Sequence, residues 1–89
     1  MTTVVGAHAV GDMETWLNGG DERKALFKSF CSSYRILKHA TNNQVCLVWS
    51  GVDLEKMQAA MSSPETAARK AKHTVIDPIE IYIEIDGGT

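Results

Sequence analysis

One order of strand-like and helical segments constrains this fold more than any other feature of the chain. Runs rich in β-branched residues, or with apolar alternation, predict strands at residues 3–10, 34–39, 44–50 and 79–85. Helical stretches fill the two long intervals, one after Gly11-Asp12 and one after Asp53. The predicted order is therefore β-α-β-β-α-β, with strands as the first and last elements.

This order is the signature of the split βαβ, or ferredoxin-like, arrangement. It predicts an α+β fold with a four-stranded antiparallel sheet in the order 4-1-3-2 and two helical layers on one face. The 89 residues fit a single domain that spans 1–89. Two domains would each be too small to bury a core.

Local signals divide the first helical stretch in two. Asp12 is a good N-cap, and Gly19-Gly20 predicts a break because two glycines cost about 2 kcal/mol of helix propensity relative to alanine. A second segment should restart near Asp21, with its apolar residues inward and its charged residues mostly outward. That charged set is Glu22, Arg23, Lys24 and Lys28.

The second helical stretch carries two start signals. Asp53 caps its first part, where Leu54, Met57 and Met61 share one face. Ser63-Pro64 then predicts a new start, since serine caps well and proline suits the first helical position.

Alternation within the strands separates sheet edges from central strands. The last strand has one apolar and one polar face, formed by Ile79, Ile81, Ile83 and Ile85 and by Glu80, Tyr82, Glu84 and Asp86. Strands 3–10 and 44–50 are largely apolar on both faces, which suits central strands covered on both sides. The helices cover only one face, so a second copy is the simplest cover for the other. We therefore expect a homodimer packed sheet to sheet.

Composition and charge exclude several classes of partner. A net charge of −2 with 9 scattered basic residues leaves no electrostatic footprint for nucleic acid. No apolar run approaches the ~20 residues of a membrane span, so no membrane association is expected. The start of the chain lacks a basic n-region, so we expect no signal peptide and a cytoplasmic location. Cys31 and Cys46 are then expected to be reduced thiols, and no histidine pair has metal-ligand spacing.

The stretch around Trp49 carries a family resemblance. Trp49 ends the third strand, Asp53 starts a helix, and Ser63-Pro64 follows. In this pattern the chain resembles the dimeric α+β barrel superfamily, which includes the antibiotic-biosynthesis-type monooxygenases. The resemblance implies two protomers packed as a barrel with helices outside. Haem-degrading members ligate haem through a histidine in that helix, but Ala60 stands at its place here, so no cofactor is expected.

A second pattern resembles uncharacterised small members of the same superfamily. It consists of His8, Val10, Asp12 and the following Trp16. We therefore predict His8 as a catalytic acid/base, since histidine titrates near neutral pH. The predicted ligand-binding residues are His8, Trp16, Phe27, Trp49 and Met57. The simpler interpretation is a satisfied imidazole on a central strand and two core tryptophans.

Three hypotheses about function stay open. The first is a homodimer that binds a small apolar or aromatic molecule between helices and sheet. The second is a cofactor-independent enzyme of the monooxygenase, cyclase or isomerase kind, with His8 as its acid/base. The third is a structural interaction module without a ligand. A pocket with His8 pointing into it would favour the second, and a solid core would favour the third.

Overall fold

The structure is a computed structural model that describes residues 2–85. Within this range the chain runs in the predicted order, with each helical stretch divided in two. The elements are β1 (Thr2–Val10), α1 (Met13–Asn18), α2 (Gly20–Lys28), β2 (Ser33–Lys38), β3 (Gln44–Val52), α3 (Leu54–Ser62), α4 (Pro64–Lys72) and β4 (Val75–Ile83).

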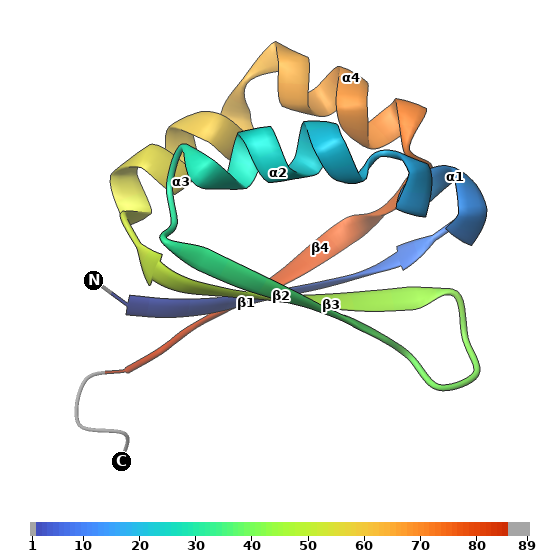
Figure 1. The fold of residues 1–89 in the computed structure, drawn as a ribbon, viewed down its shortest axis with the longest axis horizontal. Coiled ribbons are helices and arrows are strands. Elements are labelled where there is room, and N and C mark those ends of the chain that lie inside the picture. The colour runs from blue at the N-terminus through green and yellow to red at the C-terminus, as the bar shows by residue number, and fades with distance from the viewer. Residues whose placement is uncertain (1, 86–89) are drawn as a thin grey trace.

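The strands form one antiparallel sheet in the order β2-β3-β1-β4, which is the predicted 4-1-3-2 read from the other side. The predicted central strands, β1 and β3, are central, and β2 and β4 are the edges. Figure 1 shows that all the helices lie over the same face of this sheet. The α+β fold class predicted from the element order is confirmed.

The predicted helix starts are confirmed by their capping hydrogen bonds. Each cap side chain accepts a hydrogen bond from the backbone N–H three residues further on, which satisfies one of the free donors at a helix start. These bonds are Thr15 N to Asp12 Oδ1 at 3.0 Å, Lys56 N to Asp53 Oδ1 at 3.2 Å and Thr66 N to Ser63 Oγ at 3.1 Å. Helix α1 ends at Asn18 and Gly19 separates it from α2, so the predicted break is present.

The last strand differs from its predicted bounds. β4 begins at Val75 rather than at residue 79, and it ends at Ile83 rather than at 85. It contains Pro78, which the prediction placed before the strand. An edge strand tolerates proline because one side of its backbone needs no ladder hydrogen bond. Asp86, predicted on the polar face of this strand, lies outside the described residues.

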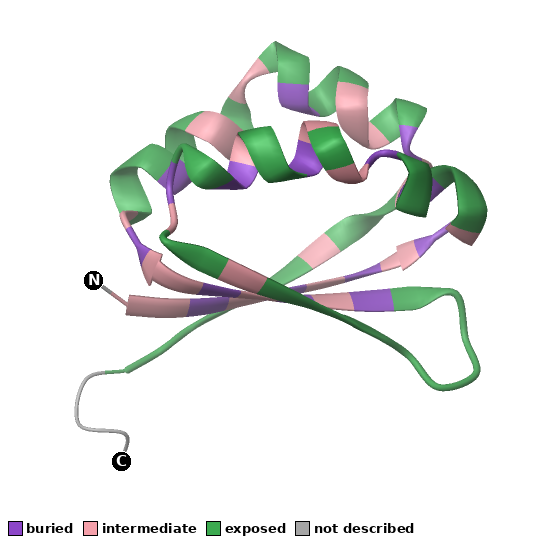
Figure 2. Ribbon diagram, viewed as in Figure 1, coloured by how far each residue is buried: buried purple, intermediate pink, exposed green. Residues whose placement is uncertain are grey.

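The core lies between the sheet and the helices. Figure 2 shows buried residues alternating along the central strands and recurring on the inner sides of the helices. The buried apolar set is Val4, Val10, Trp16, Phe27, Phe30, Val45, Leu47, Trp49, Val52 and Met57. Gly6 has no side chain among them because a Cβ there would lie 2.7 Å from the Trp49 ring.

The opposite face of the sheet has no helix over it in the described part of the chain (Figure 1). Its centre is formed by half-buried small and apolar residues, namely Val5, Ala7, Ala9, Cys46 and Val48. Around them Leu37 is 50% exposed, Ile76 48% and Tyr82 58%. We call this surface the open face.

Candidate functional site

A cavity of about 530 Å³ lies between the helices and the sheet. This volume falls within the range of about 300–1,000 Å³ typical of small-molecule sites. All five residues predicted from the sequence as ligand-binding line this one cavity: His8, Trp16, Phe27, Trp49 and Met57. They come from β1, α1, α2, β3 and α3.

His8 lies on the helix-facing side of β1 and is only 8% exposed. Its Nδ1 is 2.9 Å from the Ala9 carbonyl oxygen, and because a carbonyl can only accept, Nδ1 carries the proton and donates. The other ring nitrogen, Nε2, is therefore an acceptor in the neutral ring. The β1–β4 register shifts between Ala7 and Ala9, so His8 sits at an irregularity of the kind found beside active sites.

Burial lowers the pKa of His8 below its ordinary value, although the hydrogen bond to Ala9 opposes this. The imidazole is thus held in its neutral form near pH 7. Its ring meets the Trp16 ring edge-on, with centroids 6.0 Å apart. A neutral imidazole with a free acceptor nitrogen in an apolar cavity has the form that a general base requires.

Arg23 corrects the sequence prediction, which placed it mostly outward. It is 8% exposed and lines the cavity. Its guanidinium lies 3.6 Å from the centre of the Trp16 ring and donates a hydrogen bond to the Trp16 carbonyl oxygen. The spacing could have shown this, because Arg23 precedes the inward Phe27 by four residues and Phe30 by seven.

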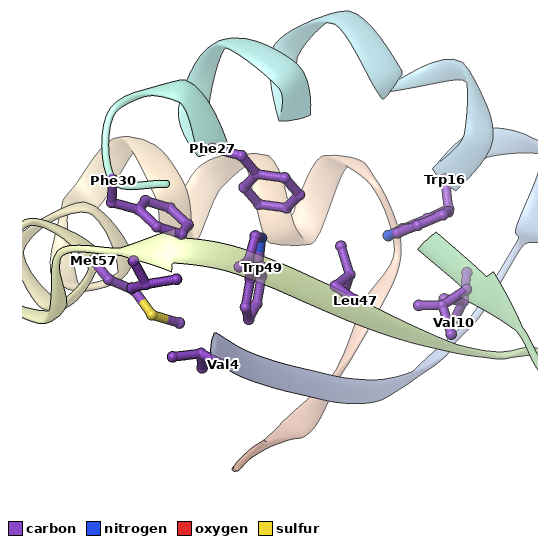
Figure 3. Close-up of a cluster of buried hydrophobic side chains, with 10 residues drawn as sticks. Val4, Val10, Trp16, Phe27, Phe30, Leu47, Trp49 and Met57 are labelled. Carbon is purple, nitrogen blue, oxygen red and sulfur yellow. The ribbon is translucent and has the colours of Figure 1, made fainter. Parts of the chain in front are cut away.

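Phe27 and Trp49 form an aromatic wall in the middle of the cavity. Their ring planes are 85° apart with centroids separated by 5.3 Å, an edge-to-face contact. Figure 3 shows the two side chains extending toward one another from α2 and β3. The Trp49 Nε1–H is buried without a hydrogen-bond partner in the described part of the chain. It is an unused donor beside the cavity.

Helix α3 contributes an apolar wall of the cavity whose methionine side chains can adapt their shape. Leu54, Met57 and Met61 all line the cavity, as their shared helix face predicts. Methionine adapts its shape to a ligand more readily than branched side chains do. Ala60, which stands at the place of the haem-ligand histidine, is half-buried against the core. Its methyl group cannot ligate iron, so this place does not fit a haem.

An ion-paired group lies beside the helix break, and two of its members, Glu22 and His73, line the cavity. Glu22 accepts a hydrogen bond from Lys72 Nζ at 2.8 Å, and its other oxygen lies 3.2 Å from His73 Nε2. Desolvation lowers the pKa of His73, although Glu22 opposes this. A Cβ on Gly19 would lie 2.5 Å from the His73 ring, so the break lets this imidazole pack against bare backbone. The sequence analysis did not assign Glu22 or His73 to the site.

Within residues 2–85 no group of three or more His, Cys, Asp or Glu residues is placed to hold a metal ion. Within the same range, no helix is both long and apolar enough to cross a membrane. Cys31 and Cys46 are free and half-buried, and burial raises the pKa of Cys31.

No protein-family model and no curated protein matches the chain. Solved structures do match it over nearly their whole length. A candidate antibiotic biosynthesis monooxygenase from Bordetella bronchiseptica has a TM-score of 0.73 at 13% identity, covering 96% of this chain and 95% of that one. SnoaB, a cofactor-independent oxygenase from Streptomyces nogalater, has a TM-score of 0.70 at 15% identity, covering 99% and 94%.

A third likeness is to an uncharacterised NIPSNAP domain protein from Burkholderia xenovorans, with a TM-score of 0.66 at 13% identity, covering 98% of this chain and 95% of that one. At such identities the likeness concerns the fold and not the chemistry. The resemblance found in the sequence is confirmed at that level: the chain has the fold of the antibiotic biosynthesis monooxygenases.

Proposed function

We propose that the chain forms a homodimer that binds a small apolar or aromatic molecule in the cavity between its helices and its sheet. The observation that carries this proposal is the cavity of about 530 Å³ into which His8 and an aromatic wall converge. An apolar enclosure with a few polar groups at fixed places is the usual form of a small-molecule site. A structural module without a ligand is less favoured, since it would be expected to have a solid core.

Burial of ligand surface supplies the binding energy in this proposal. Each 100 Å² of apolar ligand surface removed from water contributes about 2.5 kcal/mol. The edges and faces of Trp16, Phe27 and Trp49 favour flat, aromatic shapes, because offset and edge-to-face ring contacts add to simple burial.

The open face supports the homodimer. Its central residues are small or apolar, and the helices of the described chain all lie on the other face (Figure 1). Two such faces packed together would remove this apolar surface from water and leave the helices outside. The barrel assembly implied by the family resemblance has this form.

Calorimetric titration with 2-naphthamide, a neutral bicyclic aromatic, tests ligand binding. Wild type should bind it, and Leu54→Trp should weaken binding because the larger side chain occupies the cavity that Leu54 lines. The matched control is Leu17→Trp, an equally conservative change at an exposed site outside the cavity. Equal affinities in the two variants would contradict the proposal, as would the absence of wild-type binding to both 2-naphthamide and its anionic analogue 2-naphthoate.

The second candidate function is enzymatic proton abstraction by His8. It is favoured by the fixed tautomer, which leaves Nε2 free to accept a proton from an acidic C–H or O–H bond of a bound molecule. The proton would move to Nε2, giving an imidazolium and a carbanion or oxyanion. In deuterated water, wild type should exchange the acidic C–H protons of 2-tetralone faster than His8→Gln. Equal exchange rates would leave binding as the only supported function.

A further inference from the structure

Arg23 is a buried cation that has no carboxylate partner among the described residues. Its 8% exposure is among the lowest for a charged residue of this chain, and no salt bridge within residues 2–85 includes it. Buried charges are normally paired, because removing an ion from water is costly. The neighbouring carboxylate, Glu22, is engaged instead by Lys72 and His73.

The described part of the chain leaves most of the hydrogen-bonding capacity of this guanidinium unused. A guanidinium has five N–H donors in one plane. Within the described residues its side chain makes one hydrogen bond, to the Trp16 carbonyl oxygen. Stacking on the Trp16 ring uses the face of the guanidinium and leaves its edge available. Since Arg23 lines the cavity, a ligand there can reach the unused donors.

The charges around the cavity have an excess of positive sign. Arg23, Arg69 and Lys70 line it, against one carboxylate, Glu22. Lys70 is already paired with Asp77 at 3.0 Å. Arg23 is the most deeply buried of the three cations. Its low-dielectric surroundings therefore strengthen its attraction for an anion more than the surroundings of the other two cations do. Burial also lowers the pKa of Arg23, the expected sign for a cation without a counter-ion.

We infer that the molecule bound in this cavity is an aromatic or apolar anion whose planar carboxylate is held by Arg23. This inference rests on the proposed function and adds the chemical class of the ligand. A carboxylate matches the two-pronged edge of a guanidinium, which binds planar oxyanions through parallel hydrogen bonds. The apolar body of the ligand would then lie along the wall formed by Phe27 and Trp49.

A purely structural role is the alternative for Arg23. Its stacking and its hydrogen bond both go to Trp16, so it also joins α1 to α2 across the break. Such a role predicts lost stability on substitution but no preference for charged ligands. The two roles are therefore separated by the charge preference of the wild-type protein together with the loss of that preference in Arg23→Gln.

The experiment compares 2-naphthoate with 2-naphthamide, which have nearly the same shape but differ in charge. Titration calorimetry at pH 7.5 and low salt should show wild type binding the naphthoate about 10- to 150-fold more tightly, the ratio typical of a hydrogen bond to a charged group. In Arg23→Gln this ratio should fall toward one. In Lys24→Gln, an exposed cation on the same helix, it should stay near the wild-type value.

The outcomes separate the ligand class from ligand binding itself. If wild type binds both compounds equally, the anion inference is overturned and the proposed function stands. If it binds neither, both are overturned. If the charge preference persists in a folded Arg23→Gln, Arg23 is not the anchor and the inference is again overturned. If Arg23→Gln does not fold, the wild-type ratio still decides the ligand class, and Arg23→Lys, which keeps the charge without the planar edge, should retain a reduced preference.

Discussion

At the scale of single residues, His8 shows how one backbone contact sets the chemistry of a side chain. The Ala9 carbonyl fixes the proton on Nδ1, and burial keeps the ring neutral. A solvent-exposed histidine would exchange between tautomers and titrate freely. In His8 the lone pair of Nε2 can therefore accept a hydrogen bond or a proton from a molecule bound in the cavity.

The neutral His8 gives a prediction for stability against pH. Its pKa in the folded state lies below the unfolded value of about 6.5. As the pH falls through the unfolded-state pKa, the unfolded state binds more protons than the folded state does. The free energy of unfolding should therefore decrease as the pH falls from about 7.5 to 5. Urea unfolding at several pH values measures this slope.

His8→Gln should make that slope shallower. It should not abolish the slope, because the pKa of His73 is lowered in the same direction. Only the pH dependence is compared, since the substitution also changes packing at every pH. Identical slopes in the variant and in wild type would show that His8 is readily protonated in the folded protein.

Ala60 gives a prediction about haem. Without an imidazole at this place, haem titration should produce no stoichiometric complex with the absorption spectrum of histidine ligation. Absorption spectroscopy across the Soret band measures it. If a histidine-ligated spectrum does appear, His8→Gln and His73→Gln would identify which imidazole binds the iron, and this prediction would be wrong.

At the scale of elements, the two glycines between α1 and α2 differ in their surroundings. Gly19 packs against His73, whereas a Cβ on Gly20 would meet no atom within 4 Å. Adjacent glycines therefore have separate roles. The contact at Gly19 supports close packing there rather than a hinge that opens the cavity.

Single alanine substitutions should therefore have opposite effects. Gly20→Ala should stabilise the protein by about 0.5–1 kcal/mol, because alanine favours the helix and has space. Gly19→Ala should destabilise it by about 1–3 kcal/mol, since the added methyl displaces a buried imidazole from Glu22.

Urea unfolding of the two single variants measures both changes, and each serves as the control for the other. A stabilising Gly19→Ala that weakens or slows the binding of 2-naphthamide would instead indicate that the break acts as a hinge that opens the cavity. A destabilising Gly20→Ala would mean that the break needs two glycines for a reason other than packing.

Most elements could be predicted from the sequence because their signals are local. The helix caps Asp12, Asp53 and Ser63 each bond to a backbone N–H only three residues further along the chain. The alternation of apolar and polar residues along a strand likewise indicates which of its faces is buried. The start of β4 depends on tertiary pairing instead. Ile76 joins the sheet by pairing with Ala9, and no local signal near Pro78 carries that information.

At the scale of the whole molecule, the open face predicts assembly. Light scattering at micromolar concentration should give twice the 9.7 kDa of one chain. An interface of about 1,200–2,000 Å² is expected from two stable partners. Val48→Asp, at the centre of the open face, should shift the mass toward the monomer, because a carboxylate there would be buried without a partner.

The control for this prediction is Leu17→Asp, which places the same charge at an exposed position on α1. A monomer mass for wild type, or equal masses for the two variants, would contradict sheet-to-sheet pairing.

The candidate site was predictable in part from the sequence. His8, Trp16 and Trp49 could be named because they stand in sequence patterns that resemble those of the dimeric α+β barrel superfamily. Arg23 was missed because a charged residue is expected to face water. Only its spacing of four residues from the inward-facing Phe27 indicated that it shares the buried side of the helix. Glu22 and His73 come together across 51 residues of chain, a contact that no local pattern predicts.

The absence of a side chain at Gly6 limits the order in which substitutions can accumulate in this protein. Its nearest neighbour is the Trp49 ring, so a methyl group is excluded from position 6 while the indole is present. Trp49 also lines the cavity, and a smaller ring there would enlarge the chamber. A lineage that gains a side chain at position 6 must therefore first replace Trp49 with a smaller residue, a change that also alters the size of molecule the cavity accepts. Gly6→Ala should be poorly tolerated alone and better tolerated beside Trp49→Phe, and equal tolerance in both backgrounds would mean that no such path dependence exists.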